Sequence, residues 1–196
     1  MSVRAIAGRI AGSPAVYDCV QRLAGRDVIA RRITPWLAGV SGRVLDIGGG
    51  TGQLENLLRR DARYVCVDLE MPKLVQLKQR SATAAAFVAD GAALPFRSET
   101  IDNVLLFAVI HHLSEEALRA VCAEILRVLV PGGALIVLDA VRSRRLIGRL
   151  LWAIDRGSHS RTAAAIGALL EQSFQVVNAR RFPVLHDYCF FRCRKP

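Results

Sequence analysis

The chain lacks several features that identify common classes of protein. It has 196 residues and no apolar run of the 18 or more residues that a membrane span requires. Its five cysteines show neither CxxC spacing nor paired histidine ligands, so we expect no metal site and reduced thiols in a cytoplasmic protein. The opening "MSVRAIAGRIAG" lacks the continuous apolar core of a secretory signal. From these absences we expect a cytoplasmic protein without a membrane span.

Negative charge is also scarce: 27 lysines and arginines face 17 acidic residues, giving a formal net charge of +10. Such a balance attracts nucleic acid, anionic lipid or acidic substrates without choosing among them. Aromatic residues make up only 6% of the chain, and Trp152 is the only one interleaved with a basic stretch. A nucleic-acid channel normally combines basic residues with stacking aromatics, so the sequence argues against one.

Apolar runs of strand length alternate with longer segments of helical period, which predicts an α/β fold. We expect one domain over 1–196, with a seven-stranded, mainly parallel sheet, helices on both faces and a helical cap over 1–40. The last two strands are joined by a short turn near Pro183 and should form a C-terminal antiparallel hairpin. The expected strands are Arg43–Ile47, Tyr64–Asp68, Ala86–Asp90, Ile101–Phe107, Ala134–Asp139, Gln175–Arg181 and Tyr188–Arg194.

Helices should lie between these strands. Ser114, followed by Glu115 and Glu116, predicts a capped helix start, and Pro131 with the two glycines after it ends that helix. The expected helices are Pro14–Leu23, Asp27–Leu37, Gly52–Arg60, Met71–Arg80, Ser114–Val130 and Thr162–Ser173.

The stretch "VLDIGGGTGQ" places glycines 48, 50 and 52 directly after the first strand. Glycines at this point let the backbone turn sharply and approach a ligand. The pyrophosphate-binding pattern G-x-G-x-x-G needs a glycine where Gln53 stands, and no Gly-Lys-Ser/Thr of a phosphate-binding loop follows. Asp46 in front of the loop would repel phosphate, so the loop favours a cationic or zwitterionic ligand.

Two further acidic residues end the next two strands. Asp68 stands about 20 residues beyond Asp46, where a carboxylate can accept hydrogen bonds from both hydroxyls of a ribose. Asp90 ends the third strand in "FVADGAALPF", where it can accept from an adenine amino group while Gly91 lets the ring approach. The sequence therefore predicts a nucleoside-containing ligand without phosphates.

The motifs "VLDIGGGTG", "YVCVDLE", "ADGAALPF", "IDNVLLFAVIHHL" and "ILRVLVPGGALIVLD" follow one another from about Arg43 to Asp139. In this order and spacing they resemble the class I S-adenosylmethionine-dependent methyltransferases, especially the small type 11 branch with the ubiquinone and menaquinone biosynthesis enzymes. The resemblance implies a Rossmann-like methyltransferase fold, with S-adenosylmethionine as cofactor and S-adenosylhomocysteine as product. It also implies that the methionine part lies among Asp46, Gly48, Gly50 and Gly52, the ribose at Asp68, the adenine at Leu69, Asp90 and Gly91, and Phe107 beside the cofactor.

Methyl transfer from a sulfonium needs an in-line nucleophile, and a hydroxyl or an acidic carbon also needs a general base. His111 and His112, just beyond the fourth strand, are candidates for that base, although a packing role is an equal alternative. His159 and His186 are further candidates.

The segment 142–161 combines arginines with apolar residues at helical spacing. We interpret it as a lid over the substrate pocket or as a helix on an anionic membrane; an ordinary amphipathic helix packed on the sheet is the alternative. Substrate contacts are expected from Tyr17, Arg145, Arg149, Trp152 and His159.

The acceptor is expected to be a small apolar or anionic molecule methylated on oxygen or carbon. RNA base methyltransferases that resemble this fold place Asn/Asp-Pro-Pro-Tyr or Pro-Cys after the fourth strand, whereas this chain has "LFAVIHH". A non-catalytic methyltransferase-like binding protein and an NAD(P)-dependent oxidoreductase stay open as alternatives. Asp46, Asp90 and the spacing of the glycines argue against the oxidoreductase.

Overall fold

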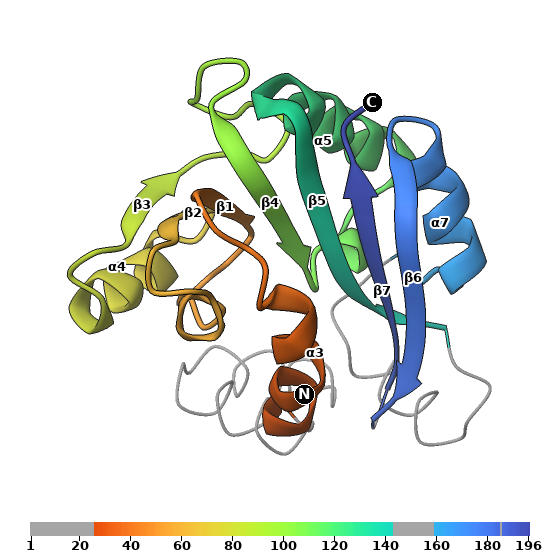
Figure 1. Ribbon diagram of the computed structural model, residues 1–196, viewed down its shortest axis with the longest axis horizontal. Helices are drawn as coiled ribbons and strands as arrows, with labels where there is room; N and C mark the ends of the chain where they lie inside the picture. The colour runs from red at the N-terminus through yellow and green to blue at the C-terminus, as the bar shows by residue number, and fades with distance from the viewer. Residues whose placement is uncertain (1–25, 143–158, 185) are drawn as a thin grey trace, which may run out of the picture.

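The computed structural model describes residues 26–142, 159–184 and 186–196. A seven-stranded sheet of order β3-β2-β1-β4-β5-β7-β6 forms its centre (Figure 1). Neighbouring strands from β3 to β5 run parallel, and β7 pairs antiparallel with both β5 and β6. The predicted fold class, including the C-terminal antiparallel hairpin, is confirmed.

The strands are β1 (Arg43–Ile47), β2 (Arg63–Asp68), β3 (Ala85–Val88), β4 (Ile101–Phe107), β5 (Leu129–Val141), β6 (Gln175–Pro183) and β7 (Asp187–Arg194). The described helices are α3 (Arg26–Leu37), α4 (Met71–Arg80), α5 (Glu115–Val128) and α7 (Ala163–Glu171), with short 3-10 turns η1 (Glu55–Leu57) and η2 (Ile110–His112).

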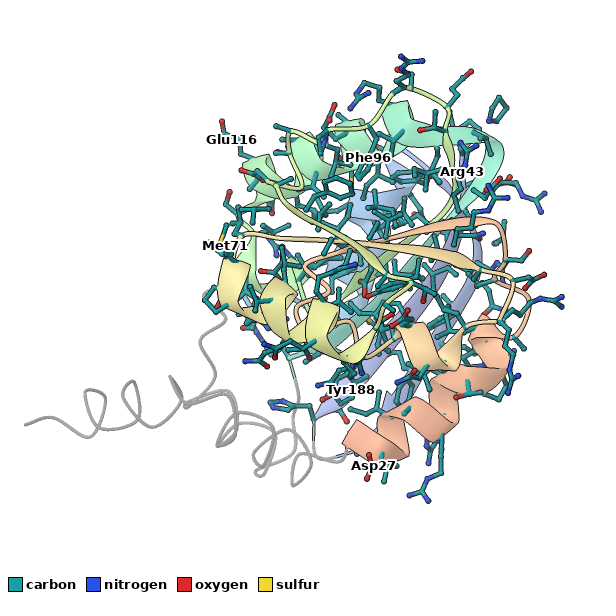
Figure 2. All side chains as sticks on the ribbon, turned by 90° about the vertical axis from the view of Figure 1, so that its left-hand side faces the viewer. Asp27, Arg43, Met71, Phe96, Glu116 and Tyr188 are labelled. Carbon is teal, nitrogen blue, oxygen red and sulfur yellow. The ribbon has the colours of Figure 1, made fainter. Side chains whose placement is uncertain are left out.

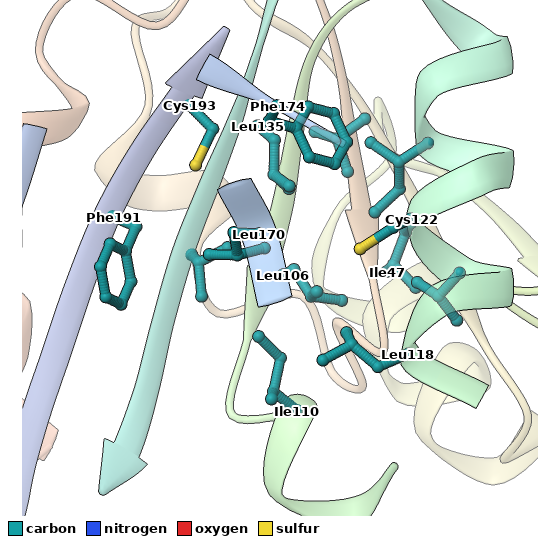
Figure 3. Close-up of a cluster of buried hydrophobic side chains, with 14 of the residues drawn as sticks. Ile47, Leu106, Ile110, Leu118, Cys122, Leu135, Leu170, Phe174, Phe191 and Cys193 are labelled. Atoms are coloured by element: carbon teal, nitrogen blue, oxygen red, sulfur yellow. The ribbon is translucent and has the colours of Figure 1, made fainter. Parts of the chain in front are cut away.

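Apolar side chains on alternate positions of the strands fill both faces of the sheet. One core joins Leu106 on β4 and Leu135 on β5 to Cys122 on α5 and Leu170 on α7 (Figure 3). On the other face, Ile33 and Leu37 of α3 pack against the sheet. Leu74 and Leu77 of α4 form a smaller cluster with Tyr64 and Cys66 of β2. The helices on both faces are therefore packed firmly against the strands, whose carboxyl ends carry the candidate site.

Helix α5 follows the predicted capping. The Ser114 hydroxyl accepts a hydrogen bond of 3.1 Å from Ala117 N, which satisfies one of the unpaired amides of the first turn. The helix ends at Val128, before Pro131, because a proline disfavours the helical conformation of the residue that precedes it.

The predicted helix over Gly52–Arg60 is wrong. Gly52 has φ +69°, and the hydrogen bonds that follow connect residues three apart: Glu55 N to Gly52 O, Leu57 N to Leu54 O and Leu58 N to Glu55 O. The segment therefore forms turns and η1. Several strand bounds also differ from the prediction: β3 ends at Val88, β6 ends at Pro183, and β5 runs from Leu129 to Val141, so that Pro131 lies within this strand.

Within the described ranges, no helix is long and apolar enough to cross a membrane, and no cluster of three metal-ligating residues occurs. Four of the five cysteines lie in these ranges as free, buried thiols. Burial raises the pKa of Cys122 to about 11, so this thiol behaves as a small apolar group.

Candidate functional site

The glycine loop at the carboxyl end of β1 is fixed by backbone hydrogen bonds. Gly48 N donates to Val67 O over 2.7 Å, and Gly50 N donates to Asp68 Oδ2 over 2.9 Å. Gly48 and Gly50 both have positive φ, at +70° and +55°, a conformation that other residues rarely adopt. A side chain at Gly48 would also collide with Val109, which follows β4. The loop therefore lies against the ends of both β2 and β4.

Asp46 lies beneath this loop and is 1% exposed. Its Oδ2 accepts a hydrogen bond of 2.5 Å from the Tyr64 hydroxyl, and its Oδ1 is buried without a hydrogen-bond partner among the described residues. Burial raises the pKa of Asp46 to about 7, while the Tyr64 hydrogen bond acts in the opposite direction. A buried carboxylate with an unsatisfied oxygen is stabilised by positive charge placed nearby.

Asp68 is held at the carboxyl end of β2 by two amides. Gly50 N donates to Oδ2, and Glu70 N donates to Oδ1 over 2.8 Å. Each carboxylate oxygen keeps a further lone pair, so both can also accept a ligand hydroxyl. Asp68, the residue predicted to bind the ribose, is thus held in a fixed position next to the glycine loop.

The predicted adenine residues follow β2 and β3. Leu69 is 68% exposed beside Asp68, which is unusual for a leucine next to a buried strand. Asp90 is exposed, and its Oδ1 accepts from Ala92 N in a turn. A side chain at Gly91 would meet Ile47 and Val121, so this glycine lets the turn pack closely on the sheet.

A cavity of about 550 Å³ lies between α3, the glycine loop and the sheet. Phe107 and Leu138, from the ends of β4 and β5, contribute to its wall, together with Thr51 and Gln53 of the loop. Figure 2 shows Asp27 of α3, another lining residue, at the same end of the molecule as Tyr188 of β7. The cavity has the size of small-molecule sites, and of the predicted cofactor-binding residues its lining includes Phe107.

A buried histidine–aspartate pair joins His111, in the turn after β4, to Asp139 near the carboxyl end of β5. His111 Nδ1 is 2.6 Å from Asp139 Oδ1, and Ile110 N donates to Asp139 Oδ2 over 2.7 Å. Asp139 is 0% exposed and His111 7%. Because a carboxylate only accepts hydrogen bonds, the proton lies on Nδ1, and Nε2 is the basic nitrogen of the neutral ring.

The sequence analysis missed Asp139 as a site residue and treated it only as the end of a strand. Its signal was a carboxylate in an otherwise apolar strand, which burial makes costly unless it is paired. Gly49 and Tyr64, which surround Asp46, were also missed.

The other predicted histidines differ in position. The His112 ring lies 4.0 Å from that of His111, centroid to centroid, and is exposed. His159 N donates to His111 O over 3.0 Å, so His159 does lie beside the turn of His111. His186 lies near the start of β7, against Tyr188. Tyr17, Arg145, Arg149 and Trp152 are outside the described residues, and so is most of the predicted basic helix.

A glycine loop without phosphate-binding geometry, an acidic residue at the end of β2 and this strand order are typical of Rossmann-like proteins that bind nucleoside-containing ligands. Comparison with known proteins indicates which class of Rossmann-like protein this chain resembles. Residues 45–137 match the family model described as "Methyltransferase domain". This match, together with the relatives and solved structures below, supports a class I S-adenosylmethionine-dependent methyltransferase of the type 11 branch, with S-adenosylmethionine as cofactor.

Two relatives illustrate this similarity. The ubiquinone/menaquinone biosynthesis C-methyltransferase UbiE of Paracoccus denitrificans is 32% identical over 163 residues, 76% of this chain and 63% of the relative. The probable tRNA methyltransferase 9B of Homo sapiens is 38% identical over 96 residues, 48% of this chain and 20% of the relative. The chain thus spans less than two thirds of each relative.

Solved structures agree on the fold. The N-methyltransferase NodS of Bradyrhizobium japonicum in complex with S-adenosyl-L-homocysteine superposes with a TM-score of 0.73 at 16% identity, covering 98% of each chain. A putative methyltransferase of Bacillus halodurans gives a TM-score of 0.72 at 16% identity, covering 85% of this chain and 98% of its own.

Proposed function

We propose that this chain transfers a methyl group from S-adenosylmethionine to an oxygen or an acidic carbon of a small molecule. The observation that carries the proposal is the buried His111–Asp139 pair just beyond β4, since an acceptor hydroxyl or C–H must lose a proton when it is methylated. A neutral amine needs no base before it attacks, so such a pair favours oxygen or carbon over nitrogen.

The cofactor side of the site fits the proposal. Asp68, fixed by two amides, accepts the ribose hydroxyls, while Leu69, Asp90 and Gly91 surround the adenine. Gly48, Gly50 and Gly52 bring the backbone close to the methionine part. The orphaned oxygen of Asp46 is compensated by the positive charge of that part. When bound, S-adenosylmethionine supplies the methyl group on a positively charged sulfur.

The protein positions the acceptor and removes its proton. We infer that the acceptor is oriented for in-line attack beyond the end of β4, on the side of the sheet that carries His111 and Asp139; the cavity beside α3 includes Phe107 and Leu138 in its lining but not His111. His111 Nε2 takes the acceptor proton, and Asp139 holds the ring in the required tautomer and stabilises the imidazolium that forms. The proton leaves to solvent after product release. His112 is the alternative base, and its exposure suits an acceptor outside the buried pair.

The acceptor class follows from the same pair and from the relatives. Several are named C-methyltransferases of ubiquinone and menaquinone biosynthesis, whose names support a ring carbon as nucleophile. One is named a probable tRNA methyltransferase, and this chain spans only 20% of it. The measured panel should therefore contain a hydroquinone, a phenol, a primary amine and bulk tRNA, with methyl incorporation from labelled S-adenosylmethionine as the readout.

The experiment compares wild-type protein with His111→Gln and Asp139→Asn, and with His112→Gln, which tests the alternative base. We expect methylation of the hydroquinone or phenol, reduced about 10²-fold or more by the first two substitutions and little by the third. Binding of S-adenosylhomocysteine should stay unchanged in all three variants. Methylation of the amine or of tRNA alone, or full activity without His111, would contradict the proposal. Cofactor binding with no transfer to any acceptor would favour a binding protein.

A further inference from the structure

The turn that carries His111 is bound on its outer side by a single arginine. Arg161 Nη1 donates to Ile110 O over 2.9 Å and to His159 O over 3.2 Å, and its Nη2 donates to Leu113 O over 2.8 Å. The carbonyl of His111 itself accepts from His159 N. The backbone carbonyls of Ile110 and Leu113, on either side of His111 and His112, thus accept hydrogen bonds from Arg161.

The inner side of the same turn is bound by Asp139, through Ile110 N and His111 Nδ1. A 3-10 turn of three residues leaves carbonyls without internal partners, and η2 is such a turn. The planar guanidinium of Arg161 spans the turn with donors of fixed geometry, which the point charge of a lysine cannot reproduce.

The backbone that leads into the turn needs this support. Ala108, two residues before Ile110, has φ +55°, which costs a non-glycine residue energy and persists only where its surroundings hold it. Its N–H donates to Leu138 O, while the far end of the segment is held by Arg161 at Leu113.

We propose that Arg161 is a positioning residue for the proton-accepting histidine: it clamps the 110–113 turn so that the His111 imidazole keeps its bond to Asp139. The role of His111 as base rests on the proposed function, whereas the clamp on its turn does not. Arg142 extends the clamp, because its N–H donates to Arg161 O and its Nη2 to Ser160 O. The residues on the two sides of segment 143–158 are thus hydrogen-bonded to each other.

The test follows the imidazole rather than turnover. Protein with ¹⁵N-labelled histidine is studied by long-range ¹H–¹⁵N correlation, and His111→Gln identifies the His111 signals. We expect wild-type His111 to show one tautomer with the proton on Nδ1. In Arg161→Gln the ring should sample both tautomers, and solvent exchange of its Nδ1 proton should be about tenfold faster, the equivalent of one lost hydrogen bond.

Arg119→Gln is the matched control, because Arg119 lies exposed on α5 and bonds to Glu115, one turn away on the same helix. It should leave the His111 signals at their wild-type values. Wild-type tautomer and exchange in a folded Arg161→Gln variant would overturn the proposal. If Arg161→Gln does not fold, Arg161→Lys serves instead: faster exchange in a folded protein supports the clamp, and wild-type exchange overturns it.

Titration with S-adenosylhomocysteine keeps the two proposals distinguishable. We expect Arg161→Gln to bind it as the wild type does and to lose turnover with an unchanged KM for the cofactor. Failure of the wild type to bind would count against the proposed function alone, since the imidazole signals report on the clamp without any ligand.

Discussion

The hydroxyl of Tyr64 donates a 2.5 Å hydrogen bond to the buried carboxylate of Asp46, directly beneath the glycine loop. The pair joins two neighbouring strands, because Asp46 on β1 lies in register with Cys66, two residues from Tyr64 on β2. The Asp46 carboxylate therefore influences the glycine loop electrostatically from the buried side of the loop.

Asp46→Asn should change how stability depends on pH. The folded-state pKa of Asp46 is raised from 3.8 to about 7, so the folded protein binds more protons than the unfolded chain between these values. The stability associated with protonated Asp46 is present below about pH 4 and is lost as the pH rises through about 7. The free energy of unfolding of the variant, relative to wild type, should rise over this window by at most about 4 kcal/mol. Urea denaturation at pH 5 and pH 8 checks this, and parallel changes in both proteins would refute it.

Tyr64→Phe should act in the opposite sense. It removes the hydrogen bond that lowers the pKa of Asp46 and leaves both carboxylate oxygens without a described partner, at a cost of about 1–3 kcal/mol. The loss should be larger at pH 8 than at pH 5, because the charged form is the one that needs the hydroxyl. A pH-independent loss would show that Tyr64 contributes only packing.

Gly49→Ala should destabilise the loop. The added methyl would collide with the Asp46 carboxylate and with Cys66 Sγ, and overpacking of this kind costs about 1–3 kcal/mol. Gly39→Ala is the control, since nothing lies within 4 Å of its added methyl. Thermal unfolding of both variants should show a lower Tm for the first and a nearly unchanged Tm for the second; equal values would contradict the packing seen at Gly49.

Alternation of apolar and helical segments was sufficient to predict the sheet, because each strand of a buried parallel sheet is a short apolar run bounded by polar residues. The helix over Gly52–Arg60 failed for a local reason: its spacing is helical, but Gly52 adopts positive φ and its carbonyl accepts from Arg80, 28 residues away. Periodicity carries no information about such a partner.

The same distinction applies to the candidate site, where local sequence patterns predicted some residues and could not predict others. Asp46, Asp68 and the glycines occur in short motifs at strand ends, so local spacing was enough to predict them as candidate site residues. Asp139 and Arg161 meet the turn of His111 from 28 and 50 residues further along the chain, and only the fold brings them together. Tertiary hydrogen bonds of this kind have no pattern in a single sequence.

The central claim is that the glycine loop and Asp68 hold S-adenosylmethionine. The most direct measurement is calorimetric titration of wild-type protein and of Asp68→Ala with S-adenosylhomocysteine, with NAD as the competing ligand and Asp61→Ala, an exposed carboxylate paired with Arg59, as the control. Micromolar binding of S-adenosylhomocysteine by wild type and control, a loss of about tenfold or more in Asp68→Ala, and no binding of NAD are the predicted results. Binding of NAD alone, or equal affinity without the Asp68 carboxylate, would contradict the claim.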